Sequence, residues 1–491
     1  MNKCLLFLLT AIVVSAQDTR PNILFILMDD LGKEWISSYG ATDIETPYMD
    51  QLATEGMRFE NYYTMPQCTP TRLSFATGQY PFRHGWVNHW DVPRWGGGAH
   101  YDPANNPSIA KNLQKAGYKT AAAGKWQVSD FRVQPDAMNL HGYDEYCMWT
   151  GYEAGVKASA QRYWDPYIHT KDGSKTYEGQ FGEDIFTDFF IDFMTEHKDE
   201  PMFMYYAMCL PHTPFVTTPD EPVIDEVMSA EMTQKEKKAA TRLNKHKAMV
   251  RYADKMVKKL VDAIDALGLR DNTLIIVTTD NGTVGSITGT RNGVKVKGAK
   301  TRTHEAGTAV PFIISQPGTV PQGVVSNTAV NVVDMLPTFT ELAGGKKDPE
   351  YTYDGYSMVD VFHGKSENGP RSFNLSMGGG NKAALTDNGV ENQFTFRDRV
   401  VRDDRYKLII DLERTPEKLF DLKKDPWEKT NMIDNPEMKE IIKRLFDSIK
   451  DQPAQDADPR YDPLGPQEWD VKITKQSQTW KKGAPREHPE N

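Results

Sequence analysis

The chain has 491 residues, of which 39% are hydrophobic and 26% are charged, and its formal net charge is −10. This length exceeds that of one small domain, and the composition is globular and excludes a disordered chain. A negative net charge without a long basic run argues against a nucleic-acid partner. An anionic substrate would therefore need a few locally placed cations.

The N-terminus predicts a signal peptide over residues 1–16. Lys3 supplies positive charge, residues 4–14 (CLLFLLTAIVV) are apolar, and small residues precede Gln17. A membrane anchor is the alternative, but this run is short for a bilayer span and no other stretch approaches that length. We expect an exported protein, periplasmic or secreted, with no membrane span.

Short apolar runs predict strands that are buried on both faces of a sheet. Helical spacing occurs around residues 185–193, and an amphipathic stretch at 252–267 ends at Gly268. Strands that alternate with helices predict an α/β fold over residues 17–365, with a large, mostly parallel central sheet flanked by helices. The predicted strands span residues 22–28, 119–123, 202–210, 273–279 and 310–315.

The pattern changes after about residue 365. Residues 399–402 and 406–411 flank a polar turn and predict a hairpin, and residues 438–449 predict a helix. We expect a smaller C-terminal α+β domain over residues 366–491. Its polar, proline-rich end forms an extended tail without predicted regular structure.

Polar residues follow the carboxyl ends of four predicted strands. Ligand sites in open parallel sheets form beyond these ends, so we expect the groups to meet in one cleft. The carboxylate and amide oxygens among them suit calcium or magnesium, whereas zinc prefers histidine and cysteine. Either oxygen pair alone could equally be a turn or a helix cap. The strand-end residues are Asp29 and Asp30, Lys125, His212, and Asp280 and Asn281.

Three cysteines remain after the predicted signal peptide, too few for a disulfide framework. Cys147 and Cys209 could pair or be separate buried thiols. Cys68 lies in Gln-Cys-Thr-Pro-Thr-Arg, and Cys-x-Pro-x-Arg before a helix-like segment matches the signal read by enzymes that oxidise cysteine to formylglycine. With this motif the chain resembles the type I sulfatases of the alkaline phosphatase superfamily, from about Pro21 to the C-terminal part.

Further family motifs occur in the expected order, and the ordered set is far more specific than any single motif. The resemblance implies an alkaline phosphatase-like fold and a bacterial sulfatase that acts on a sulfated glycan or oligosaccharide. It also implies a maturation partner, either a formylglycine-generating enzyme or an anaerobic maturase. The motifs span residues 22–30, 124–126 (GKW), 211–214 (PHTP), 280–282 (DNG), 300–307 (KTRTHEAG), 310–312, 402–408 and 419–426.

The resemblance also implies a role for each matched residue. Cys68, as the formylglycine hydrate, attacks sulfur and ligates the metal, which we expect to be calcium in preference to magnesium. A hydrate has two hydroxyls, so one attacks and the other later expels sulfate by reforming the aldehyde. The other implied roles are metal binding for Asp29, Asp30, Asp280 and Asn281, positioning of the hydrate for Arg72, sulfate binding for Lys125 and Lys300, and leaving-group protonation for His212 with Lys300.

Residue 127 departs from the family pattern. Sulfatases commonly carry histidine after Gly-Lys-Trp, whereas this chain carries Gln127. An amide forms hydrogen bonds but is no base near neutral pH. We therefore expect Gln127 to be a contact residue, with another group or water regenerating the aldehyde, unless this subfamily needs no side-chain base.

Substrate contacts are less defined. Residues 86–95 (WVNHWDVPRW) are rich in aromatic and hydrogen-bonding side chains, so His89, Trp90 and Arg94 are candidates, although the loop could be purely structural. Arg291, with Lys295 and Lys297 nearby, could reach a polyanionic glycan or could be solvated surface charge.

Three other functions remain open from the sequence. A phosphodiesterase or phosphonate hydrolase could use the same fold and nucleophile. A non-catalytic glycan-binding relative is suggested by Gln127 alone, and such a protein would have no chemical need for the whole motif set. A cysteine hydrolase that uses Cys68 as a thiolate lacks an evident local base motif.

Overall fold

The computed structural model describes residues 20–87, 100–131, 133–149, 162–225, 231–378, 383–386, 389–392 and 396–462. The predicted signal peptide and the candidates His89, Trp90 and Arg94 lie outside these residues. In the part of the chain that is described, no helix combines the length and the apolar character needed to cross a bilayer.

A ten-stranded sheet forms the centre of the molecule, in the order β13-β2-β12-β9-β1-β8-β4-β5-β6-β7. Its five middle strands run parallel to one another. Every residue of β1 and β9 is buried, because helices cover both faces. The strands are β1 (Asn22–Met28), β2 (Met57–Phe59), β4 (Lys119–Lys125), β5 (Glu145–Trp149), β6 (Tyr167–Thr170), β7 (Gly173–Thr176), β8 (Met202–Ala207), β9 (Thr273–Thr279), β12 (Phe312–Ser315) and β13 (Val324–Ser326).

The predicted mostly parallel α/β fold is confirmed, with antiparallel strands added at the margins of the sheet. Three of these are β12, which lies between β9 and β2, and the β6–β7 hairpin beside β5. The β7 residues are polar and largely exposed, so no apolar run marked this strand in the sequence.

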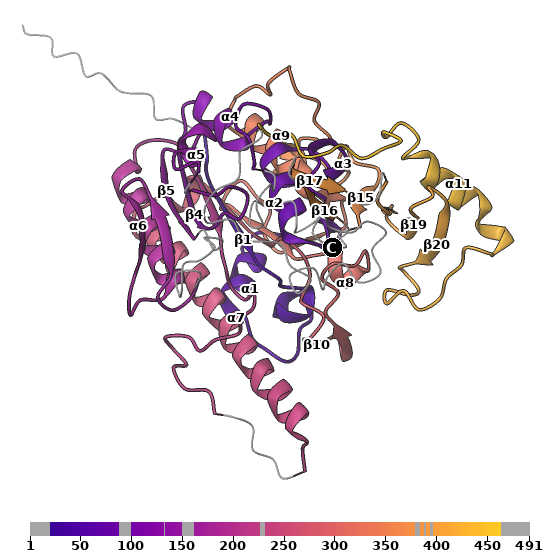
Figure 1. The fold of residues 1–491 in the computed structure, drawn as a ribbon, viewed down its shortest axis with the longest axis horizontal. Coiled ribbons are helices and arrows are strands. Elements are labelled where there is room, and N and C mark those ends of the chain that lie inside the picture. Colours follow the sequence, from indigo (N-terminus) through magenta and orange to yellow (C-terminus); the bar gives the residue numbers. More distant parts are fainter. Residues whose placement is uncertain are drawn as a thin grey trace, which may run out of the picture.

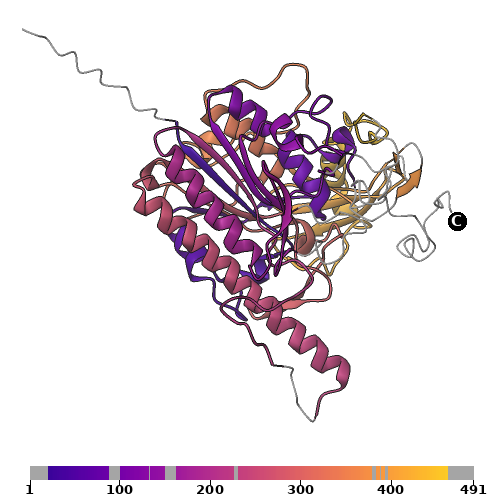
Figure 2. The same cartoon turned by 60° about the vertical axis from the view of Figure 1, so that its left-hand side comes forward.

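Two layers of helices enclose the sheet (Figures 1 and 2). One apolar layer contains α1 (Pro47–Thr54), α6 (Gly182–His197) and α7 (Gln234–Ala266), and the other contains α2 (Cys68–Thr77), α4 (Ile109–Lys115) and α9 (Met335–Leu342). Shorter helices are α3 (Pro81–His84), α5 (Ala137–Leu140), α8 (Glu305–Thr308) and α10 (Val359–Phe362).

The predicted helix at 252–267 is much longer than expected, because α7 already begins at Gln234. Its first turns are charged and lack an apolar stripe, so hydrophobic periodicity could not reveal them. A capping box marks the true start, with the Thr233 side chain accepting from the Glu236 N–H and the Glu236 side chain accepting from the Thr233 N–H.

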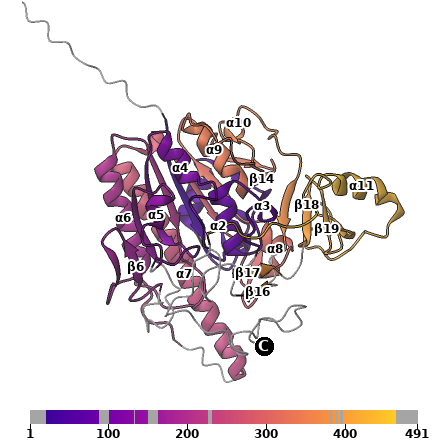
Figure 3. The same cartoon turned by 45° about the horizontal axis from the view of Figure 1, so that its top comes forward.

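A smaller antiparallel sheet at one side of the molecule confirms the expected C-terminal α+β domain (Figure 3). The predicted hairpin is β18 (Arg399–Arg402) and β19 (Tyr406–Ile410), and the predicted helix is α11 (Lys439–Asp447). The sheet adds β15 (Asn374–Met377) and β20 (Pro416–Asp421). Small two-stranded pairs are β3 (Tyr62–Tyr63) with β14 (Val330–Asn331), β10 (Thr288–Arg291) with β11 (Val294–Lys297), and β16 (Ala383–Thr386) with β17 (Gly389–Asn392).

Candidate active site

The ends of β1 and β9 bring the four oxygen donors together. These strands pair in parallel, with Met28 opposite Thr279, so the residues that follow them meet at one edge. The Asp30 N–H donates to Asp280 Oδ1 at 3.1 Å, and the Asn281 amide donates to Asp30 Oδ1 at 2.7 Å. The predicted convergence of the two motifs is therefore what the structure shows.

Three cations balance the three carboxylates of this cluster. Lys125 Nζ lies 2.6 Å from Asp29 Oδ2, and Lys300 Nζ lies 2.6 Å from Asp30 Oδ1. The Arg72 guanidinium lies 2.8 Å from Asp280 Oδ2 and 3.7 Å from Asp29 Oδ2. Burial alone would raise the pKa of Asp29, but the nearby cations Lys125, Arg72 and Lys300 outweigh it and hold that pKa well below its usual range.

Cys68 opens α2 at the same edge, and only 3% of it is exposed. The Gln127 amide donates to Cys68 Sγ at 3.5 Å. Burial raises the pKa of the thiol, but the positive charges of Lys125 and Lys300 lower it by more. The pKa of Cys68 therefore lies below its usual value. Cys68, the predicted nucleophile, therefore interacts electrostatically with Lys125 and Lys300, the two predicted sulfate-binding lysines.

His212 closes the cluster on the β8 side. Its Nε2 lies 3.5 Å from Asp30 Oδ2, and its Nδ1 lies 3.0 Å from Arg162 Nη1. Burial holds the pKa of His212 well below its usual value, although Asp29 opposes this, so the ring is neutral at pH 7. The sequence did not single out Arg162, which has no motif around it and also lies 4.1 Å from the centre of the Trp149 ring.

Three of the seven described non-glycine residues with a positive φ lie at this edge. Asp30 (φ 68°), Gln127 (φ 71°) and Thr301 (φ 72°) all adopt the left-handed conformation that favours glycine. Each lies in the cluster or next to one of its members. Strain of this kind persists where surrounding structure enforces it, and it is typical of functional sites.

Two buried oxygens of the cluster have no hydrogen-bond donor among the described residues. They are Asp29 Oδ1 and Asn281 Oδ1. Buried acceptors without a partner are rare in folded proteins, so their presence together needs an explanation. Carboxylate and amide oxygens suit a hard divalent cation. Among the described residues, the ligand atoms of Asp29, Asp30 and His212 lie within 4.8 Å of one another, so this group shares two carboxylates with the predicted ligand set and contains His212 in place of Asp280.

Arg291 is not brought into this cluster. Its guanidinium donates to the Tyr39 carbonyl at 2.8 Å and to Glu60 at 3.4 Å. It lines a cavity of about 270 Å³ together with Glu305 and Arg402. Lys295 and Lys297 lie on the exposed strand β11.

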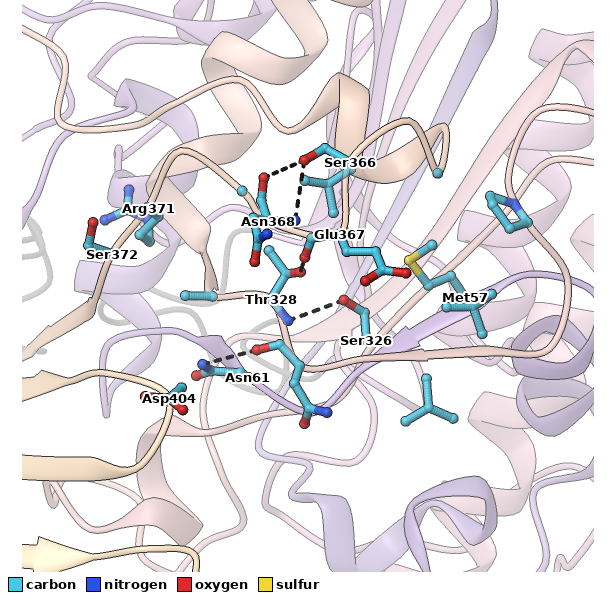
Figure 4. Close-up of a pocket in the computed structure, with 18 residues that line it drawn as sticks. Met57, Asn61, Ser326, Thr328, Ser366, Glu367, Asn368, Arg371, Ser372 and Asp404 are labelled. Atoms are coloured by element: carbon cyan, nitrogen blue, oxygen red, sulfur yellow. Dashed lines mark hydrogen bonds between the residues drawn. The ribbon is translucent and has the colours of Figure 1, made fainter.

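A cavity of about 700 Å³ lies along the edge strand β13 (Figure 4). Asn61, Ser326, Thr328 and Arg371 are among its lining residues, and none of the predicted site residues that the structure describes is. Size alone therefore does not locate the chemistry, which is identified by the convergence of charged groups.

The three cysteines in the described residues, Cys68, Cys147 and Cys209, are all free and buried. Cys147 and Cys209 are therefore separate thiols rather than a disulfide. Burial raises the pKa of Cys147 to about 12, so this thiol stays protonated at neutral pH.

Glu183 holds the chain that leads to His212, and the sequence did not single it out. This buried carboxylate accepts from the N–H groups of Cys209 at 2.8 Å and Leu210 at 3.2 Å, and from the Tyr206 hydroxyl. Burial raises its pKa from the usual 4.5 to about 7. The folded protein retains this proton in that pH window and the unfolded chain releases it, so the group's contribution to stability falls as pH rises from about 4.5 to 7.

We expect Glu183→Gln to remove this pH dependence. Glutamine retains an acceptor for the two N–H groups but has no titrating proton. Between pH 5 and 8, the wild type should lose up to about 3 kcal/mol of stability relative to the variant. Urea unfolding at several pH values measures this difference, and parallel stability curves for the two proteins would contradict it.

Comparison with known proteins places this arrangement in context. Residues 21–345 match the family model described as sulfatase, and residues 299–455 match the model for the C-terminal part of N-sulphoglucosamine sulphohydrolase. The N-acetylgalactosamine-6-sulfatase of Rattus norvegicus is 29% identical over an alignment of 363 residues, and the match covers 69% of this chain and 65% of that protein. The chain thus spans about two thirds of this relative's length.

Two further similarities cover more of the chain. The ulvan-active sulfatase of Formosa agariphila is 26% identical over an alignment of 478 residues, and the match covers 89% of this chain and 82% of that protein. The crystal structure of Ps i-CgsB matches with a TM-score of 0.72 and 24% identity, over 95% of this chain and 98% of that one. This last likeness concerns the fold.

Proposed function

The chain belongs to the sulfatase family, and on that premise we propose that it is a sulfuric ester hydrolase whose nucleophile is formylglycine made from Cys68. One observation carries the proposal. Cys68 lies at the start of α2 within one buried cluster of three carboxylates, an amide and three cations, drawn from segments up to 271 residues apart. A sulfate ester is an anion, and this cluster provides the charge neutralisation that attack on it requires.

We propose that a divalent cation, calcium in preference to magnesium, is held by Asp29, Asp30, Asp280 and Asn281. When bound, it would supply positive charge that stabilises the charge developing on the sulfate oxygens. The two oxygens without donors, Asp29 Oδ1 and Asn281 Oδ1, support this assignment. The contacts of Lys300 and His212 with Asp30 support a position for both side chains beside the proposed ion.

The chain's own residues provide the rest of the proposed mechanism. One hydroxyl of the residue 68 hydrate loses its proton to another group or water and attacks sulfur, while Arg72 orients the hydrate and Lys125 and Lys300 bind sulfate oxygens. The bond between sulfur and the ester oxygen breaks, and the leaving alcohol takes a proton from Lys300 or His212. The second hydroxyl then loses its proton, the aldehyde reforms, sulfate leaves, and water restores the hydrate.

His212 is neutral, so as a donor it would use a ring N–H rather than an imidazolium. Asp30 raises the pKa of Lys300 above its usual value despite burial, so this lysine carries a proton at pH 7. Gln127, which donates to Cys68 Sγ, is proposed to position the hydrate, and another group or water removes the final proton.

The substrate we propose is a sulfated glycan or oligosaccharide. The sequence relatives named above are described as N-acetylgalactosamine-6-sulfatase and ulvan-active sulfatase, and both names point to sulfated carbohydrates. The predicted signal peptide supports export, and the Cys-x-Pro-x-Arg motif supports a maturation enzyme as partner. We also propose the division into a catalytic domain over 17–365 and a C-terminal domain over 366–491.

Relative turnover of two ester classes tests this proposal against a phosphodiesterase or phosphonate hydrolase. With mature protein and calcium, we expect kcat/KM for 4-nitrophenyl sulfate to exceed that for bis-4-nitrophenyl phosphate by about 100-fold or more. The two probes share a leaving group, so the ratio reports recognition of the central atom and its oxygens. Preference for the phosphodiester would contradict the sulfatase assignment.

A further inference from the structure

The first turns of α7 project beyond the rest of the molecule (Figures 1 and 2). The helix packs on the sheet through its later residues, and His246 marks the point where it meets the body. The His246 ring contacts Trp35, which follows β1, and Phe215, which follows β8, with centroid distances of 4.5 and 5.2 Å. Residues 234–245 therefore extend past the strand-end edge that holds the candidate active site.

Four cations lie along one face of this projecting segment. Their spacings of three, four and three residues place them within an arc of about 80° and along about 15 Å of helix. His246 and Met249 continue the same face and are buried against the body. The face that packs on the molecule therefore becomes a cationic face where the helix leaves it, and we refer to Lys235, Lys238, Arg242 and Lys245 as the α7 stripe.

The cations in the later part of α7 differ from the stripe because they are paired with acidic side chains. Arg251, Lys255, Lys258 and Lys259 all form ion pairs with acidic groups, at distances of 2.8 Å or less. Within the described ranges, no residue of the α7 stripe forms an ion pair, and Lys235, Lys238 and Arg242 are exposed. Four cations with no neutralising partner attract anions, in a chain whose net charge of −10 otherwise repels them.

The end of the α7 stripe nearest the body of the molecule lies beside the segment that follows His212. The Arg242 guanidinium lies 4.9 Å from the centre of the Phe215 ring, and Phe215 is three residues after His212. An anionic chain lying on the stripe would therefore approach the His212 side of the cluster.

We propose that the α7 stripe binds sulfate groups of an extended glycan at positions remote from the ester that is hydrolysed. This proposal rests on the proposed function and narrows its substrate class to polymers with several sulfates. Lysine and arginine bind sulfate oxygens by charge-assisted hydrogen bonds, and a linear row of cations suits a linear polyanion. A nucleic acid is also a polyanion, but the α7 stripe lies near the segment that follows His212 in the candidate active site, which favours a glycan.

Binding of fluorescently labelled dextran sulfate to the full chain tests the proposal. The stripe variant is Lys235→Gln/Lys238→Gln/Lys245→Gln, which leaves Arg242 on Phe215. The matched control is Lys424→Gln/Lys429→Gln/Lys450→Gln, three exposed lysines of the C-terminal part with the same charge change. Over about 50 to 200 mM salt, we expect the stripe variant to bind about tenfold or more weakly with a shallower salt dependence, and the control to follow the wild type.

Equal affinity and salt dependence in all three proteins would overturn the proposal, as would tighter binding to single-stranded DNA than to dextran sulfate. Failure of the proposed function gives a different result, namely no sulfate release from 4-nitrophenyl sulfate by the wild type while polymer binding still depends on the stripe. In active protein, the rate with a sulfated polymer relative to 4-nitrophenyl sulfate should fall about tenfold in the stripe variant, in line with its loss of affinity.

Discussion

Cys68→Ala is expected to lower kcat for sulfate-ester hydrolysis by on the order of 10⁵-fold, because alanine cannot be converted to formylglycine and offers no nucleophile. The side chain is small and lies at the start of α2, so the variant should still fold. Initial rates with 4-nitrophenyl sulfate at saturating calcium measure the loss. Binding of a substrate analogue by the same variant shows whether the rest of the site is intact.

Cys147→Ala is the matched control for this substitution. Cys147 is equally buried in β5, but its thiol makes no contact with the charged cluster in the described structure. We expect its kcat to stay within about threefold of the wild type, with only a modest loss of stability. If Cys68→Ala retained more than about a tenth of wild-type kcat, Cys68 would not be the nucleophile.

Removal of the divalent cation is expected to lower the rate by on the order of 10³-fold, since a metal supplies several kcal/mol of charge stabilisation in a site of this kind. Mature protein treated with a chelator and then titrated with calcium or magnesium gives the measurement. Activity should return with calcium at lower concentrations than with magnesium, because the oxygen set suits a larger and less strictly octahedral ion.

Asn281→Ala tests the same metal site by substitution. The substitution removes one buried oxygen that would bind the metal, and it removes the hydrogen bond that the Asn281 amide donates to Asp30. It leaves no buried charge unpaired. We expect the calcium concentration for half-maximal activity to rise about tenfold or more, with recovery of activity at high calcium. Full activity of chelated wild type, or an unchanged calcium requirement in Asn281→Ala, would contradict the assigned metal site.

Much of this site could be predicted from the sequence because its residues follow apolar strands. The strand at 22–28 and the strand at 273–279 were predicted with the bounds that the structure has. Parallel strands bring their carboxyl ends to one edge, so the separation of Asp30 from Asp280 along the chain did not hide their proximity. The roles assigned to these residues remain predictions.

Side chains that act through other groups were not predictable in the same way. Arg162 touches His212, and Glu183 holds the N–H groups before it, but neither lies in a motif, and both contacts depend on how β5, α6 and β8 pack. The first turns of α7 were missed for a related reason. They bury no apolar stripe, so only the cap at Thr233 marks their start.

The mass of the peptide that contains residue 68 tests the central claim most directly. Protein produced together with a formylglycine-generating enzyme should yield this peptide about 18 Da lighter than the cysteine form, because CHO replaces CH2–SH. Sulfate release across preparations should rise in proportion to the lighter fraction. If only unmodified Cys68 is found in protein that hydrolyses sulfate esters, the formylglycine mechanism proposed for this chain is wrong.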